Sequence, residues 1–225
     1  MDDVLVRAER LSRRFGSGEQ ATAAVRDATF EILAGQRIAL FGPSGSGKST
    51  LLHLVAGLLP PSSGRIEWPA LGSVDRLRPG PVAFAFQGLS LLPPLTIVEN
   101  VALPILLDGG EEEAAMKAAW AMIDRLELTP IGHKLAEEVS GGQAQRAGVA
   151  RALLGQPKLV LADEPIGQLD RATGDRVMDV VLSCVEQIGA ALVVSTHDQV
   201  VADRLPLRWS IEDGRLTTEV VLRSA

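Results

Sequence analysis

The chain has 225 residues, and its 22 lysines and arginines against 28 aspartates and glutamates give a net charge of −6. This length suits one α/β domain with a sizeable buried core, and 46% hydrophobic with 22% charged residues excludes a disordered chain. Proteins that bind nucleic acids usually have a basic surface, whereas this chain has a net negative charge, so no nucleic-acid partner is expected.

Membrane spans and disulfides are not expected either. No apolar run approaches the roughly 20 residues that cross a bilayer, and the acidic start at 1–3 leads into no signal-like stretch. The single cysteine, Cys184, fits a reducing compartment and is expected to be a small core residue. We therefore expect a cytoplasmic chain that meets a membrane only through a partner.

Apolar β-type runs alternate with helical patterns along the chain, which predicts an α/β fold with a largely parallel sheet. Strands are predicted at 4–6, 28–32, 36–41, 82–86, 159–162 and 191–195. A polar loop is predicted at 15–20, and helices at 51–59, at 111–126, after Gly142 and at 174–189. The acidic run at 111–113 is interpreted as a solvated helix start rather than a metal site.

The most specific motif is Gly-Pro-Ser-Gly-Ser-Gly-Lys-Ser at 42–49, between a predicted strand and a predicted helix. Its glycines let backbone N–H groups converge on phosphate oxygens, and the helix start adds positive potential. Lys48 is expected to reach the β- and γ-phosphates, and the Ser49 hydroxyl to hold Mg²⁺. The alternative, an ordinary glycine-rich turn, carries little weight. The expected contacts are Gly42, Pro43, Ser44, Gly45, Ser46, Gly47, Lys48, Ser49 and Thr50.

Two further motifs are less specific on their own. Asp163 and Glu164 end an apolar strand, where the first could bind Mg²⁺ and the second could act as general base toward a water. The alternative is that the strand simply ends in a polar loop and the two acids have no functional role. Ser140-Gly141-Gly142-Gln143 has the spacing of a capping box, and its open helix start could also hold a second anion.

Taken together and in this order, these motifs resemble the nucleotide-binding subunit of an ATP-binding cassette (ABC) transporter. The resemblance covers essentially the whole chain, with Gln87 after a strand, a signature at 139–143, Leu169–Asp170 and His197 completing the set. It implies a P-loop NTPase core with a mostly parallel sheet and an N-terminal antiparallel β subdomain. It also implies a division into a core at 1–87 and 157–225 and a helical subdomain at 88–156.

The resemblance also implies roles for single residues. Gln87 would contact Mg²⁺ and the attacking water, His197 would contact the γ-phosphate, and Phe15 would stack on the adenine ring. Without these roles, Gln87 would be an exposed loop amide, His197 a structural histidine and Phe15 a core aromatic. Asp170 would lie at a dimer interface, or simply cap a helix. His53 and His133 match no motif and are expected to be structural or exposed.

The implied mechanism needs two copies of the chain. The ATP bound by one copy would be covered by four residues of the other copy, Ser140, Gly141, Gly142 and Gln143. These residues would contact the γ-phosphate across a two-fold interface. The signature begins with Val139 where the family usually has leucine, and Gly167–Gln168 stand where Ser-Ala is common. Both a general base and a signature are present, so a homodimer with two sites is expected.

The implied partner is a transmembrane permease, contacted through 87–104 unless that stretch serves internal packing. Its Leu-Leu-Pro and Glu-Asn-Val-Ala-Leu-Pro segments are similar to the lipoprotein-release and macrolide-export branch. The short interval from Gly64 to Gln87 is instead closer to small-solute importers. An importer subunit and a cell-division ATPase that transports nothing are the alternatives. Attachment at the cytoplasmic face of the cell membrane is expected.

Overall fold

The structure, a computed structural model, describes residues 3–18, 21–87 and 90–219. The chain forms two compact units. The first combines Met1–Leu77 with Ala191–Ala225, and the second is the intervening Arg78–Ala190. The predicted division into a core and a helical subdomain at 88–156 has other boundaries and stays a prediction.

Three of the sequence predictions touch residues outside the described part of the chain. These are the acidic start at Met1 and Asp2, the end of the loop predicted at 15–20 (Glu19 and Gln20), and Gly88 with Leu89 in the expected permease contact.

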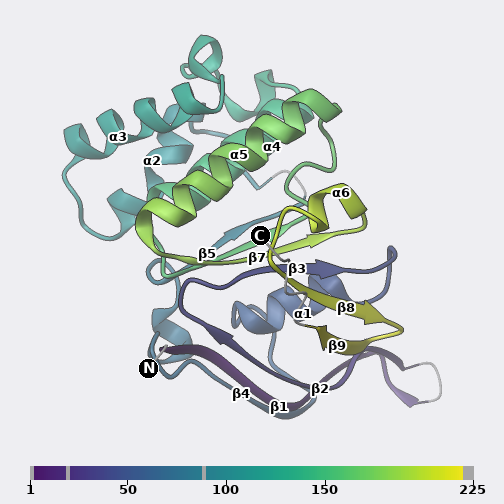
Figure 1. Ribbon diagram of the computed structural model, residues 1–225. Coiled ribbons are helices and arrows are strands. Elements are labelled where there is room, and N and C mark those ends of the chain that lie inside the picture. Colours follow the sequence, from purple (N-terminus) through teal and green to yellow (C-terminus); the bar gives the residue numbers. More distant parts are fainter. Residues whose placement is uncertain (1–2, 19–20, 88–89, 220–225) are drawn as a thin grey trace. The chain divides into compact units, whose positions relative to one another are not determined.

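The first unit begins with an antiparallel β subdomain. Strand β1 (Val4–Phe15) lies between β2 (Thr22–Leu33) and β4 (Ser63–Glu67), and both pairings are antiparallel (Figure 1). The two long strands extend well beyond the predicted short ones. Register shifts in β1 explain the difference, because bulges let a strand continue through polar residues that break the apolar alternation. The predicted antiparallel subdomain is confirmed.

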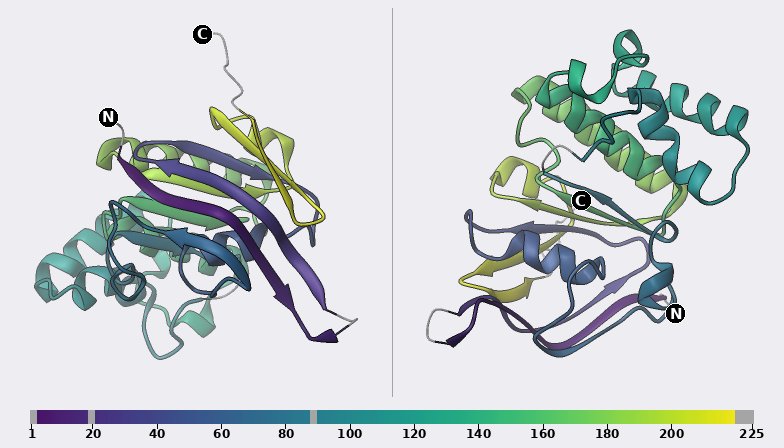
Figure 2. Two further views of the ribbon diagram at one scale, coloured as in Figure 1. Left: turned by 90° about the horizontal axis from the view of Figure 1, so that it is seen from below. Right: turned by 180° about the vertical axis from the view of Figure 1, so that it is seen from behind.

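The parallel core of the first unit is built around β3 (Arg37–Phe41). This strand pairs in parallel with β7 (Ala191–Thr196) on one side and with β8 (Leu207–Glu212) on the other. Strand β9 (Arg215–Glu219) forms an antiparallel hairpin with β8, drawn in yellow in Figure 2. The mostly parallel sheet is thus confirmed, whereas β4, β8 and β9 were not predicted.

Helix α1 (Lys48–Val55) follows β3 and is shorter at its end than the predicted helix. Gly57 adopts a φ of 64°, which ends the helix before Pro60. The Trp68 indole donates a hydrogen bond to the carbonyl oxygen of Val55 at 2.8 Å. That contact satisfies one of the carbonyl groups left open at the helix end. The short helix α6 (Gln199–Ala202) follows β7.

The second unit contains a two-stranded parallel ladder of β5 (Val82–Ala85) and β6 (Leu159–Asp163). Every residue of β6 is buried, as predicted for an apolar run covered on both faces. Its helices are α2 (Ile97–Leu107), α3 (Glu112–Arg125), α4 (Gly141–Leu154) and α5 (Arg171–Ile188) (Figure 1). Short 3₁₀ turns occupy Val74–Arg76 in the first unit and Thr129–Ile131 and Ala136–Glu138 in the second.

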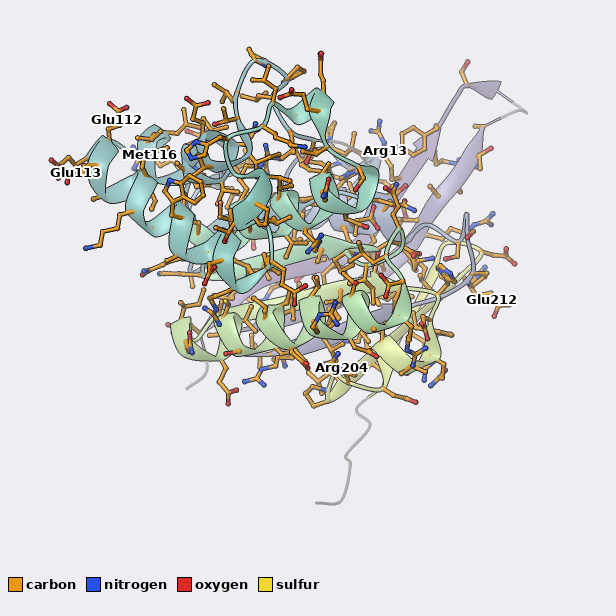
Figure 3. All side chains as sticks on the ribbon, turned by 90° about the horizontal axis from the view of Figure 1, so that it is seen from above. Arg13, Glu112, Glu113, Met116, Arg204 and Glu212 are labelled. Carbon is orange, nitrogen blue, oxygen red and sulfur yellow. The ribbon has the colours of Figure 1, made fainter. Side chains whose placement is uncertain are left out.

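The acidic run before α3 behaves as a solvated helix start. Glu111 is the N-cap, and Glu112 and Glu113 lie in the first turn, pointing away from the ribbon (Figure 3). Negative charge there is favoured by the helix dipole. Within residues 3–18, 21–87 and 90–219, no three His, Cys, Asp or Glu side chains gather as a metal site.

The remaining predicted structural residues lie as expected. Cys184 is buried in α5, and burial raises the pKa of its thiol. His133 is exposed and packs its ring against Trp120 at 4.7 Å between centroids. His53 lies in the last turn of α1.

Candidate functional site

A glycine-rich loop joins β3 to α1 within the first unit. Gly47 adopts a φ of 110°, which L side chains rarely adopt, and a Cβ there would overlap the carbonyl oxygen of Ala24. A Cβ on Gly42 would likewise overlap the carbonyl oxygen of Ile211. Both ends of the loop therefore require glycine for close backbone packing.

The Lys48 ammonium is held at this loop. Its Nζ donates to the carbonyl oxygens of Gly42 at 2.8 Å and Pro43 at 3.0 Å, and the residue is only 6% exposed. These bonds keep a positive charge at the start of α1. The predicted neighbours Ser44 and Gly45 are exposed on the loop, and Ser49 and Thr50 lie half-buried in the first turn of the helix.

The start of α1 has the chemistry of an anion site. Gly47 supplies no side-chain cap and the first turn contains no acid, so the helix N–H groups and the positive end of its dipole are not neutralised there. The Ser46 hydroxyl is buried and, in the described part of the chain, has no hydrogen-bond partner. A phosphate oxygen would satisfy such a group. The loop therefore fits the phosphates of a nucleotide.

His197 leaves β7 beside the glycine-rich loop. The residue before it, Thr196, accepts a hydrogen bond from the backbone N–H of Gly42 at 3.3 Å. Because β3 and β7 are parallel, both leave the sheet at the same edge. The structure thus brings the exposed His197 close to the loop, while its contact with a γ-phosphate stays a prediction.

Phe15 lies at the end of β1 and is 41% exposed. The guanidinium of Arg13 lies 4.9 Å from the centre of its ring. The ring is exposed, so the alternative prediction that Phe15 is a core aromatic is wrong. An exposed ring suits stacking on a planar base.

In the second unit, Asp163 and Glu164 lie at the end of the buried strand β6. They are 4% and 8% exposed, and Glu164 has a φ of 48°, in the left-handed region that is uncommon for residues other than glycine. The ladder matches Ala85 with Ala162, so both strands end at one edge. Gln87 is exposed just beyond that edge, on the same side as the two carboxylates.

The signature segment begins helix α4 with a complete capping box. Ser140 N–H donates to the Gln143 side chain at 2.9 Å, and Gln143 N–H donates to the Ser140 hydroxyl at 3.3 Å. The structural interpretation of this segment is therefore confirmed. It does not exclude an anion contact, because other N–H groups of the first turn remain available.

The loop before α5 packs against this helix start. A Cβ on Gly141 would come within 2.9 Å of the Gln168 side-chain oxygen, and one on Gly142 within 3.0 Å of Leu169. Asp170 accepts a hydrogen bond from Thr173 N–H and caps α5, as the structural alternative predicted. Hydrogen bonds from Thr173 lower the pKa of the Asp170 carboxyl.

Part of the stretch predicted to meet a permease is internally packed. The fully buried Asn100 amide donates to the carbonyl oxygens of Leu92, Leu95 and Thr96 at 3.0–3.1 Å, and its oxygen accepts from Leu92 N–H at 2.7 Å. This network fastens the preceding loop to α2. It also presents the Leu92 side chain at the surface, where it is 46% exposed.

Leu92 borders a cavity of about 900 Å³ within the second unit. The cavity lies at β5 and the ends of α2 and α4, and its lining is mainly apolar. Arg78 and Arg151 also line it, and burial lowers the pKa of both guanidiniums. One terminal nitrogen of Arg78 is buried with no hydrogen-bond partner in the described residues.

Gln145 supports the backbone around Glu164, and the sequence analysis missed it in this role. Gln145 is 6% exposed on α4, and its side chain bonds to the backbone of both Glu164 and Gln168. The only sequence signal was its place on the buried face one turn after Gly141.

Residues 25–167, more than half of the chain, match the family model described as ABC transporter. The chain belongs to the ABC transporter family. It is 39% identical to the lipoprotein-releasing system ATP-binding protein LolD of Legionella pneumophila (strain Paris), over 96% of this chain and 98% of that one. It is 41% identical to LolD of Gluconobacter oxydans (strain 621H), over 94% of each chain.

A solved structure extends this similarity to three dimensions. This ABC ATPase superposes with a TM-score of 0.89 on the dimeric ATP-binding cassette MJ0796 in a post-hydrolysis state bound to ADP and phosphate. The two chains are 31% identical, over 98% of this chain and 100% of that one. The chain is thus an ATP-binding and ATP-hydrolysing cassette with a P-loop NTPase fold, as the resemblance implied.

None of the described helices is long and apolar enough to cross a membrane.

Proposed function

We propose that this ABC ATPase energises a separate membrane permease of the lipoprotein-releasing type, from the cytoplasmic face of the membrane. The observation that carries the proposal is similarity along nearly the whole chain to ATP-binding subunits of that system. Release or export driven by mechanical coupling follows from that assignment. An importer subunit and a regulatory ATPase that transports nothing are the competing functions.

The first unit would supply most of the contacts to ATP. Backbone N–H groups of the loop and of the first turn of α1 receive the phosphate oxygens, and Lys48 neutralises charge on the β- and γ-phosphates. Phe15 stacks on the adenine. His197, which leaves the sheet beside the loop, contacts the γ-phosphate.

The second unit would supply the hydrolytic groups. The Glu164 carboxylate takes a proton from a water as its oxygen bonds to the γ-phosphorus and the bond to ADP breaks. The Gln87 amide orients that water. Mg²⁺ would be held by Ser49, Gln87 and Asp163, whose oxygen donors are the kind it prefers, and when bound it neutralises charge between the β- and γ-phosphates.

A second copy of the chain would complete each site. Residues 140–143 of one copy close over the γ-phosphate bound by the other, and Asp170 lies in the loop at the two-fold interface. The close packing of Gly141 and Gly142 against Gln168 and Leu169 supports this, because the two segments lie side by side in the second unit. The dimeric state of the similar cassette MJ0796 supports it as well.

The permease would bind the cavity that Leu92 borders. Its apolar lining favours an apolar helix of the partner, and the two partly buried guanidiniums of Arg78 and Arg151 favour an acidic residue on that helix. Residues 88–156 would then form the helical subdomain that passes the movement on.

The decisive experiment uses Glu164→Gln, which keeps the shape of the side chain but cannot accept the proton. With saturating ATP and Mg²⁺, this variant should double its mass by light scattering while its phosphate release falls at least about 100-fold. The wild-type chain should return to monomer as it consumes ATP.

The control combines Glu164→Gln with Lys48→Ala. This double variant should stay monomeric at the same ATP concentration, because its phosphate loop lacks the ammonium. A monomeric Glu164→Gln chain that has bound ATP would contradict the two-copy site.

A further inference from the structure

One amide side chain in the second unit bridges the general base and the interface loop. Gln145 on α4 donates from Nε2 to the carbonyl oxygen of Glu164 at 2.8 Å, and its Oε1 accepts from the backbone N–H of Gln168 at 3.2 Å. The residue is 6% exposed, and its bond to Glu164 is buried while its bond to Gln168 is partly buried. A buried amide with both ends bonded holds its partners at a fixed separation.

The first partner is in an unfavourable backbone conformation. Glu164 has a φ of 48°, which brings its Cβ close to its own backbone and persists only where the surroundings hold it. Two donors meet at its carbonyl oxygen, the Gln145 amide and the backbone N–H of Gly167 at 3.0 Å. These donors stabilise the conformation that aims the Glu164 carboxylate.

The second partner belongs to the loop that packs on the signature segment. The Gln168 side chain and Leu169 lie against Gly141 and Gly142, so closely that a Cβ on either glycine would crowd them. Gln145 comes one turn later on the same helix. A displacement of the start of α4 would therefore be transmitted to the backbone of Glu164 through the Gln145 side chain.

We propose that Gln145 is a positioning residue for hydrolysis, which locks the left-handed backbone of Glu164 and links it to the signature segment. The inference rests on the proposed role of Glu164 as general base. Both hydrogen bonds of the Gln145 side chain go to backbone atoms. Gln145 acts through the direction of the Glu164 carboxylate, and a misdirected base transfers its proton slowly.

The test is Gln145→Met, which keeps a long unbranched side chain but removes both bonds. The kcat for ATP hydrolysis should fall about 10- to 100-fold, while KM for ATP stays within about twofold, because Gln145 is not one of the residues proposed to contact ATP. Gln145→Asn, one methylene shorter, cannot span both partners and should show the same kcat loss with less disturbance of packing.

The distinguishing readout is a double-mutant cycle with Glu164→Gln. If Gln145 acts through the Glu164 carboxylate, adding Gln145→Met to Glu164→Gln should lower the residual rate by less than about twofold. A merely structural role would instead lower the residual rate by the same factor as in the wild-type background, and that result would overturn the proposal.

The matched control is Arg146→Met, at the next position of α4. Arg146 donates to the backbone carbonyl oxygens of Leu126 at 2.7 Å and Glu127 at 3.4 Å, so its loss also removes two bonds of the helix to backbone. It should lower the melting temperature at least as much as Gln145→Met and leave kcat within about twofold of wild type.

Failure of this inference can be told from failure of the proposed function. If Glu164→Gln abolishes hydrolysis but Gln145→Met turns over normally, only the positioning role is wrong. If Glu164→Gln hydrolyses ATP at the wild-type rate, the assignment of the general base is wrong, and the positioning role falls with it.

Discussion

The Lys48 ammonium is hydrogen-bonded to the loop that is proposed to bind the phosphates of ATP. Two carbonyl oxygens, of Gly42 and Pro43, accept hydrogen bonds from it at 2.8 and 3.0 Å and restrict the side chain. A charge held in place in advance loses little side-chain entropy when an anion arrives.

We therefore expect Lys48→Ala to weaken ATP binding at least tenfold, which corresponds to about 1.4 kcal/mol. Isothermal titration calorimetry on the isolated chain measures the Kd directly. Lys117→Ala, which removes an exposed lysine of α3, is the control and should leave the Kd unchanged. An unaltered Kd in Lys48→Ala would contradict the assignment of the phosphate loop.

Single residues were predicted well where their partners are near in sequence. The Ser140–Gln143 pair and the Asp170 cap involve residues three apart, so their spacing alone predicts the bonds. Gln145 bonds to backbone groups about twenty positions away, and nothing in a local pattern shows where such an amide points. The metal and base roles of Asp163 and Glu164 stay predictions.

At the scale of elements, α2 shows why some predictions failed. Its sequence contains β-branched residues and Pro104, which lower helix propensity, so no separate helix was predicted there. A capping box outweighs them, since Thr96 N–H and its hydroxyl both donate to the Glu99 carboxylate, at 2.7 and 2.6 Å. The Thr96–Glu99 signal was present in the sequence but was not used.

This capping box has a consequence for pH dependence. The bonds from Thr96 lower the pKa of Glu99 below its ordinary value of 4.5. The ionised carboxylate is therefore favoured in the folded state, and its contribution to stability is present above that value and lost as the pH falls through the lowered pKa.

We expect the difference in free energy of unfolding between the wild-type chain and Glu99→Gln to shrink on acidification from pH 6 to below about pH 4. Urea unfolding at both pH values gives this difference. In a Thr96→Val background, which lacks the hydroxyl donor but keeps the backbone N–H, the pH dependence should be smaller than in the wild-type background. A difference that is constant with pH in the wild-type background would refute the linkage.

At the scale of the whole molecule, the sequence predicted the fold class because each apolar strand run carries its own signal. The parallel pairing of β3 with β7 and of β5 with β6 follows from such runs. Strands β4 and β9 contain few apolar residues, and tertiary pairing rather than local preference makes them strands. Strand β8 alternates Leu207, Trp209 and Ile211 with polar residues, a strand signal that was present in the sequence but was not used.

The choice of permease is also a property of the whole assembly. With ATP, Glu164→Gln used as bait in gently solubilised membranes of the source organism should retain a permease with few spans and a large extracytoplasmic domain. Mass spectrometry identifies what co-purifies. A many-span permease with a solute-binding protein would instead make this chain an importer subunit.

The matched bait for this experiment adds Leu92→Glu. A carboxylate at the rim of the cavity should reduce recovery of the permease several-fold, because it replaces an apolar contact with a charge and competes with the partner's acidic residue for the guanidiniums of Arg78 and Arg151. ATP-driven dimerisation of the same bait should be unaffected. Full recovery with this bait would place the permease contact elsewhere.

Strand β3, which leads into the phosphate loop, takes both of its neighbours from the far end of the chain. On the ribosome, residues 37–41 emerge before the second unit, and β7 and β8 emerge only after the entire second unit has been made. Until then the strand has no partner on either side, and the loop has no fixed exit from the sheet. A nascent chain would thus form the fixed start of its phosphate loop only after β7 and β8 have been made, later than the loop residues themselves.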